Sequence, residues 1–299
     1  MLTRSRPASL RAIACVTGAA LALAACASAT PPVATATQPV RMAPSDSAPA
    51  APADGLSAAF HEQFAEADTR ARTITYWMQC VGTVARLRAG GTFGRAAAAP
   101  RAIYCTRTGD GVPVGGVYDI DSAYRKITRL QMVRLDGTRP RYTEGLDTLR
   151  IAREARAVRE VNRRLTVAWT KRNRPFSAVA VPRADGTVEA WVIPRTNKAR
   201  SIVTGGDMGF LLTSGDSLQL LADRSATWTQ LNLAATGPLR LYSSTRDVPA
   251  VADLVSARYY TELGRDVTVS TPLAVSTLVP GLDPATGARV VWKHTRAAP

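Results

Sequence analysis

Residues 176–194, FSAVAVPRADGTVEAWVIP, decide the fold class of this chain. Two apolar runs lie on either side of Asp185-Gly186, a dipeptide that favours the tight turn of a β-hairpin. Residues 208–222 repeat this arrangement around Ser214-Gly215-Asp216. Strands joined by short hairpins are antiparallel neighbours. This part of the chain therefore predicts an antiparallel, hairpin-rich sheet.

The C-terminal part predicts more strands and one helix. The helix covers residues 250–263, because Pro249 lies near its start and Gly264 follows its end. The expected strands cover residues 239–244, 267–271, 273–279 and 288–293. Most of the connections are short, which favours antiparallel pairing here too.

Upstream of the hairpins, apolar residues recur at helical spacing in residues 56–67 and 74–87, although the second stretch would also suit a strand. Residues 102–136 predict short strands. Their expected turns are Asp110-Gly111, Gly115-Gly116 and Asp136-Gly137.

A long amphipathic helix is expected over residues 146–171. Ile151, Ala155 and Val158 share one face with Leu165, and this face predicts packing against a core. The opposite face carries Arg150, Arg153, Arg156, Arg159, Arg163 and Arg164, with Glu160 among them. Such a face is either solvated or a surface for anions or membranes.

These patterns together predict an α+β fold with N-terminal helices, an antiparallel, hairpin-rich sheet and one long amphipathic helix. The globular body is expected at residues 55–299, with a sub-boundary near 173–176. Its length is sufficient for a substantial core.

The first 25 residues have the three parts of a secretory signal peptide. Arg4, Arg6 and Arg11 precede an apolar stretch at residues 12–25, and no acidic residue occurs before Cys26. The apolar stretch is too short to cross about 30 Å of hydrocarbon. Residues 1–25 are therefore expected to be removed after export.

The end of this segment, Leu23-Ala24-Ala25-Cys26, resembles the lipobox of bacterial lipoproteins. In that family the cysteine receives a diacylglycerol, the chain is cut before it, and the new amine is often acylated, with chains such as palmitate. The resemblance implies lipidation of Cys26 and a bilayer as partner. Ala27 in place of aspartate implies the outer membrane, with the body facing the periplasm. The alternative is an ordinary signal peptide with an unrelated cysteine.

Residues 26–54 contain mostly Ala, Pro, Ser and Thr after the cysteine and show no apolar periodicity. Such a segment buries too little apolar surface to order itself, so we expect a disordered tether between the lipid and the body.

The formal net charge of the chain is strongly positive. Without the three arginines of the signal peptide, the formal charge of +15 becomes +12. A basic balance suits nucleic acid or anionic envelope components, and export excludes nucleic acid as the partner. The alternative is a compositional bias toward Arg without function.

Two cysteines remain after Cys26. In an oxidising compartment, Cys80 and Cys105 predict one disulfide bond. They do not form a metal site with His61 or His294, because no known ligand spacing results. We expect no cofactor or metal.

The block Gly215-Asp216-Ser217-Leu218 is similar to the motif of the GDSL esterases, in which the serine is the nucleophile. That family places the block early in an α/β domain, with an aspartate two residues before the closing histidine. Here the block is late, and Val291 stands at that offset from His294. Without a base the hydroxyl is not activated, so a turn is the preferred interpretation.

Residues 239–271 resemble the metal-site segment of JAB1/MPN metalloprotease domains. That segment reads His-x-His, then Pro-Ser-x-x-Asp at the start of a helix. Only Pro249 and Asp253 match, and Ser243, Ser244 and Thr245 lie where the histidines would be. The resemblance implies a site that has lost its metal. Alternatively, Asp253 is a first-turn acid favoured by the helix dipole.

Residues 176–222 are also similar to uncharacterised bacterial secreted proteins, with Gly205-Gly206-Asp207 before a strand. The glycines predict a turn with positive φ. No residue set identifies a catalytic site. We expect a binding or structural protein of the cell envelope, and the alternative is a hydrolase acting on envelope substrates.

Overall fold

The computed structural model describes residues 54–93, 102–107, 112–135, 146–171, 174–196, 198, 201–215, 217–233, 237–243, 245, 247–281 and 290–298. The predicted signal peptide, Cys26, almost all of the tether, Asp110-Gly111 and Asp136-Gly137 lie outside these ranges. Residues 49–299 form one compact unit.

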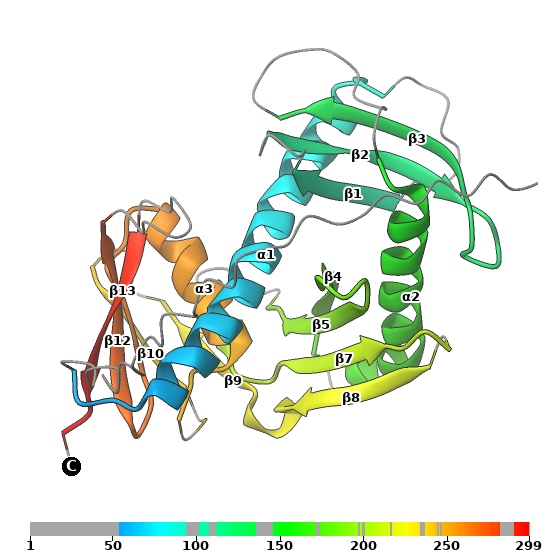
Figure 1. The fold of residues 1–299 in the computed structure, drawn as a ribbon. Coiled ribbons are helices and arrows are strands. Elements are labelled where there is room, and N and C mark those ends of the chain that lie inside the picture. The colour runs from blue at the N-terminus through cyan, green and yellow to red at the C-terminus, as the bar shows by residue number, and fades with distance from the viewer. Residues whose placement is uncertain are drawn as a thin grey trace, which may run out of the picture. The chain divides into compact units, whose positions relative to one another are not determined.

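The described chain has the α+β fold that the sequence predicts (Figure 1). The helices are α1 (Ala58–Ala89), α2 (Thr148–Lys171) and α3 (Val251–Glu262), with a short 3-10 turn, η1 (Ser225–Thr227). The strands are β1 (Ala102–Arg107), β2 (Pro113–Ile120), β3 (Ile127–Arg134), β4 (Phe176–Pro182), β5 (Val188–Pro194), β6 (Ser201–Thr204), β7 (Met208–Leu212), β8 (Leu218–Asp223), β9 (Thr229–Asn232), β10 (Leu239–Tyr242), β11 (Val267–Ser270), β12 (Ala274–Pro280) and β13 (Val290–Arg296).

The strands form four sheets, whose orders are β1-β2-β3, β4-β5-β7-β8, β10-β11-β12-β13 and β6-β9. The predicted hairpins are confirmed, because β4 pairs with β5 and β7 with β8 in antiparallel register. Gly186 turns the first hairpin with a φ of 76°. One pair departs from the expectation: β10 and β11 are parallel, because α3 forms the crossover between them.

Helix α1 is one continuous helix across both periodic stretches. Ser57 caps its N-terminus by accepting a hydrogen bond from the backbone N–H of Phe60 at 3.1 Å. Its first half packs, through Phe60, Phe64 and Ile74, into a core shared with β4, β5 and α3. Its second half packs against β1 and β2. The helix therefore contacts two different sheets.

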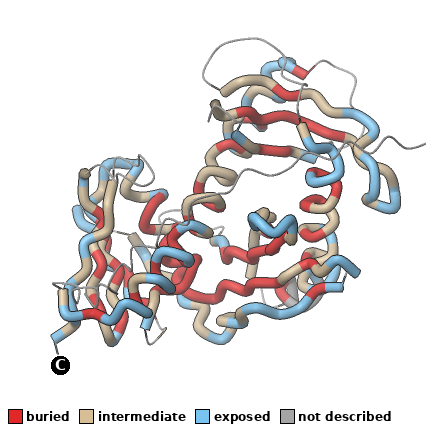
Figure 2. The backbone as a smooth tube through the Cα atoms, in the orientation of Figure 1, coloured by how far each residue is buried: buried red, intermediate tan, exposed pale blue. Residues whose placement is uncertain are grey.

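Helix α2 also contacts two sheets. Ile151 and Ala155 pack against the β1-β2-β3 sheet, and Ala157 and Val161 pack against the β4-β5-β7-β8 sheet. Figure 2 shows buried residues along both helices and in the central strands. The two helices thus join the same two sheets. No helix within the described ranges is long and apolar enough to span a bilayer.

The prediction of a turn at Gly115-Gly116 is wrong, because both glycines lie inside β2. A Cβ on Gly115 would come within 2.6 Å of the Val84 side chain, and one on Gly116 within 1.9 Å of the Gln131 carbonyl oxygen. The glycines therefore allow close approach of α1 and β3 to the strand, rather than a change of direction.

The arginines of α2 make many contacts within the protein. Arg153 donates to the Gly186 carbonyl at 2.9 Å, and Arg159 lies over the Tyr124 ring at 4.3 Å. Arg163 forms an ion pair with Glu160. Several arginines of the basic face predicted from the sequence are therefore engaged in contacts within the protein.

Candidate functional site

The predicted disulfide is present between Cys80 and Cys105, whose Cα atoms are 6.1 Å apart. It joins the second half of α1 to the edge strand β1. The lipidation site predicted at Cys26 lies outside the described residues.

Ser217, from the esterase-like block, lies in the hairpin between β7 and β8. Its hydroxyl is 2.9 Å from the hydroxyl of Thr213. Within the described ranges no histidine contacts it. The hydroxyl pair therefore closes the turn that the sequence predicted.

Asp253 is in the first turn of α3, as expected, but its carboxyl group is fully buried. One oxygen accepts a hydrogen bond from the Gly205 N–H at 2.8 Å. Gly205 and Gly206 have positive φ values of 60° and 74°, which confirms the predicted turn. Burial raises the pKa of Asp253 to about 6. The carboxyl group thus ties the β6–β7 turn to the start of α3.

A second buried carboxyl group, that of Asp207, lies near Asp253. Arg224 contacts it at 3.2 Å, and burial raises its pKa. Ser243, from the region that resembles a metalloprotease site, accepts from the Ala250 N–H at 2.9 Å. Among the described residues no group of three or more metal ligands gathers here or elsewhere.

The two histidines have partners that the sequence did not reveal. His61 lies 3.2 Å from the carboxylate of Asp54. His294 shares a hydrogen bond with Ser276 at 2.9 Å, and the two imidazole rings are 5.5 Å apart. Because Ser276 is fully buried, a substrate cannot reach its hydroxyl, and the cluster fixes β13 to α1.

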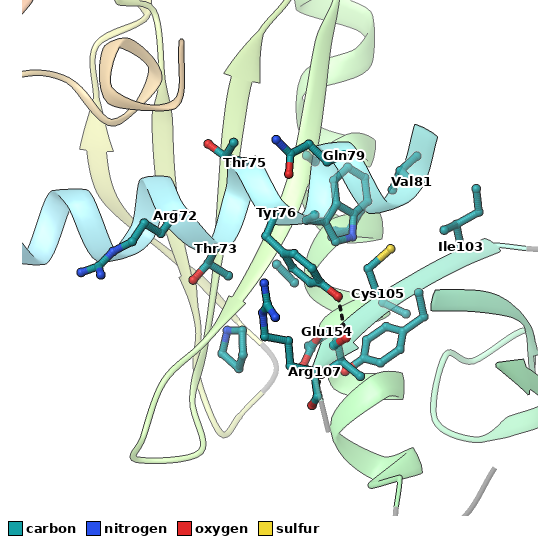
Figure 3. A pocket seen from close by; sticks show the side chains of 18 of the residues that line it. Arg72, Thr73, Thr75, Tyr76, Gln79, Val81, Ile103, Cys105, Arg107 and Glu154 are labelled. Atoms are coloured by element: carbon teal, nitrogen blue, oxygen red, sulfur yellow. Dashed lines mark hydrogen bonds between the residues drawn. The ribbon is translucent and has the colours of Figure 1, made fainter. Parts of the chain in front are cut away.

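A cavity of about 1370 Å³ lies between α1, β1, α2 and β4 (Figure 3). Its apolar lining includes Trp77 from α1, Ala155 and Val158 from α2, and Ala178 and Ala180 from β4. The cavity exists because the two helices hold the two sheets apart.

Four arginines and two glutamates line this cavity, and two of the arginines are paired with the nearby carboxylate of Asp68. The arginines are Arg72, Arg107, Arg150 and Arg258, and the glutamates are Glu154 and Glu262. The guanidinium group of Arg107 lies over the ring of Tyr76 at 4.6 Å. The Tyr76 hydroxyl donates to the Thr106 carbonyl oxygen at 2.7 Å. This contact holds α1 against β1 at one wall.

Glu154 is the buried acid of the cavity. It accepts from Arg150 at 2.8 Å and from the Tyr104 hydroxyl at 3.4 Å. Burial raises the pKa of Glu154, and Arg150 opposes the shift. Burial also raises the pKa of Tyr104 and brings that of Tyr118 to about 12. Both phenols are therefore protonated donors at neutral pH.

The sequence contains a partial signal for this site. Glu154 follows Arg150 by four residues, which permits an ion pair on one helix face. It also stands beside Ala155 in the apolar stripe, so an acid near the core was deducible. The cavity itself depends on the separation of two sheets, which no local pattern reports.

Comparison of the chain with protein-family models, with curated proteins and with solved structures found no match.

Proposed function

We propose that the chain is an exported lipoprotein of the cell envelope and that its body binds a ligand in the cavity between α1 and α2. The cavity is the observation that carries this proposal. Ligand sites are concave and combine apolar walls with a few placed polar groups. This one combines apolar residues from three elements with the ion pair between the exposed Arg150 and the buried Glu154.

The proposal of a lipid anchor rests on the sequence of the first 26 residues. Two or three acyl chains on Cys26 give stable attachment, whereas one chain is marginal. Cys26→Ala should leave the protein soluble or unprocessed after cell fractionation. Intact mass spectrometry of the wild type should show an acylated mature N-terminus, and an unmodified one would refute the anchor.

A binding role is favoured over the alternative, a hydrolase. Nucleophilic hydrolysis needs a nucleophile in contact with a base. The residues that line the cavity include no serine or histidine, and Cys105 is held in the disulfide. Glu154 is engaged by Arg150. The lining therefore offers recognition groups rather than an activated nucleophile.

The binding proposal is tested with anilinonaphthalene sulfonate, an anionic aromatic dye whose fluorescence rises in apolar sites. We expect saturable binding to the native protein. Val158→Trp fills the cavity and should weaken the dye affinity by about tenfold or more. Leu149→Trp is the matched control, because Leu149 is 75% exposed and does not line the cavity. Equal affinities in both variants would overturn the proposal.

A further inference from the structure

The two histidines of the chain meet where the start of the body and its last strand come together. His61 lies on α1 and His294 on β13, and their ring centroids are 5.5 Å apart. Asp54, which precedes α1, lies 3.2 Å from the Nε2 atom of His61. Its carboxylate also accepts a hydrogen bond from the Leu56 N–H at 3.0 Å. A small cluster of titratable groups therefore links the start of the body to its C-terminal strand.

The surroundings of the His294 ring favour its neutral form. The rings of Phe60 and Phe64 on α1 have their centroids 5.4 and 4.4 Å from that of His294. The Nδ1 atom of His294 shares a hydrogen bond with the hydroxyl of Ser276, on β12, at 2.9 Å. None of these neighbours carries a formal negative charge that would stabilise an imidazolium. Burial accordingly lowers the pKa of His294.

The charged groups that face His294 are engaged with other partners. After burial, the charge of His61 also lowers the pKa of His294, whereas the carboxylates of Asp54 and Asp68 raise it. Asp54 is paired with His61, and Asp68 accepts two hydrogen bonds from Arg258 on α3. Strand β12 has no ionisable side chain. A proton on His294 would therefore bring a positive charge close to His61 without a carboxylate of its own.

β13 is the part of this cluster that is able to move most easily. It is an edge strand of its sheet and the last strand of the chain. Each of its seven residues is at least partly exposed, and its cations, Lys293 and Arg296, are exposed. Phe60 and Phe64, by contrast, are 3% exposed. Edge strands near a terminus open at a lower free energy than a core does. Release of β13 would uncover the two phenyl rings and expose His294 to water.

We propose that His61 and His294 form an acid-sensitive latch, which holds β13 on α1 and β12 while His294 is neutral and releases the strand when both rings are protonated. This device is separate from the binding function of the cavity. Protonation of both histidines places two positive charges on rings 5.5 Å apart. Once β13 has moved, the His294 ring is hydrated and distant from His61, so its imidazolium form is stable there.

The direction of the pH dependence follows from the lowered pKa of His294. In a released, hydrated strand a histidine titrates at about 6.5. The latched state is therefore fully favoured above about pH 6.5, and its advantage is lost as the pH falls toward the lower pKa of the latched state. Because release takes up one proton at His294, the ratio of released to latched molecules should rise by up to about tenfold per pH unit in this window.

The first measurement is an NMR titration of the full chain, which has two histidines and so gives two sets of imidazole signals. His294 should titrate below about 6.5. His61→Gln removes the like charge and should raise the pKa of His294. The matched control is Glu62→Gln, an exposed change at the next position of α1, which should move the pKa of His294 much less.

Hydrogen exchange measures the release of β13 itself. The Ala297 N–H donates to the Leu273 carbonyl, and the amides of Thr295 and Lys293 face β12 by the alternation along the strand. After correction for the intrinsic effect of pH on exchange, these three amides should lose about tenfold or more of their protection between pH 7.5 and 5.5. The amides of β5, a strand that is paired on both sides, should keep theirs.

His294→Gln keeps a polar partner for Ser276 but does not titrate, so it should abolish the pH dependence of exchange in β13. If this variant does not fold, His294→Phe provides the same test. Three results would overturn the latch: pH-dependent exchange that persists without His294, a pKa of His294 that does not respond to His61→Gln, or an equal loss of protection in β5, which would indicate unfolding of the whole body.

Discussion

The buried ion pair between Asp68 and Arg258 should dominate the stability of the body. Asp68, on α1, accepts two hydrogen bonds from the Arg258 guanidinium, both at 2.6 Å, and one from the Trp292 indole N–H at 2.9 Å. Asp68 and Arg258 are 5% and 8% exposed. One carboxylate therefore ties α1 to both α3 and β13.

The perturbation is Asp68→Leu, which leaves the guanidinium buried without its partner. Breaking a buried pair costs about 3–5 kcal/mol. Two charge-assisted bonds of about 1.5–3 kcal/mol each lead to the same range. The free energy of unfolding of a typical domain is about 5–15 kcal/mol, so this loss is a large fraction of it. Urea denaturation, followed by tryptophan fluorescence and circular dichroism, measures the change.

Two controls test the reasoning. Asp68→Leu combined with Arg258→Met removes both charges and should recover about 2 kcal/mol of the loss, because an apolar replacement of both partners is often neutral. Glu160→Leu breaks an exposed pair with Arg163 and should cost about 1 kcal/mol or less. A double variant as unstable as the single one, or a loss below about 1 kcal/mol for Asp68→Leu, would refute the argument.

Three further predictions concern other parts of the fold. Replacing Cys80 and Cys105 by alanine opens a loop of 25 residues and should lower the free energy of unfolding by about 3.5 kcal/mol; an unchanged urea midpoint would contradict this. Burial lowers the pKa of His294 below 6.5, so the unfolded chain binds the proton more readily and stability should fall as the pH drops below about 6.5. His294→Phe should remove this part of the slope between pH 7.5 and 5.5, and identical slopes would contradict the assignment. Gly116→Ala forces a Cβ against the β3 backbone and should cost more than about 2 kcal/mol, as measured by the thermal midpoint, whereas Gly82→Ala, in open space on α1, should stabilise slightly.

The elements that the sequence predicted well are those with local signals. Asp185-Gly186 specifies a turn by its own conformational preferences, and both hairpins follow. The bounds of α2 and α3 match within about two residues, since apolar periodicity and flanking residues define helix ends.

The elements that the sequence missed depend on tertiary contacts. β6 and β9 are four residues each, and their paired residues lie 25 to 31 positions apart in the chain, so neither carries a periodicity that stands out. Gly115-Gly116 has the composition of a turn, but contacts with Val84 and Gln131 place it inside a strand. The parallel pairing of β10 with β11 follows from the α3 crossover.

The site residues divide in the same way. The Cys80–Cys105 pair followed from counting, because only two cysteines remained. The contact between His61 and His294 joins residues 233 positions apart in the sequence, and the arginines of the cavity come from four separate elements. Proximity of this kind cannot be inferred from spacing along one chain.

The Asp68–Trp292 hydrogen bond spans 224 residues, and this span constrains the order in which the protein is able to fold. α1 is synthesised near the start of the body, yet its buried face is covered by α3 and β13, which are synthesised last. Contacts of such long range form slowly, and surface left uncovered in the interval is prone to aggregation. The apolar face of the first helix therefore stays uncovered, or is held by a chaperone, until residues 290–298 have been synthesised and the fold is completed.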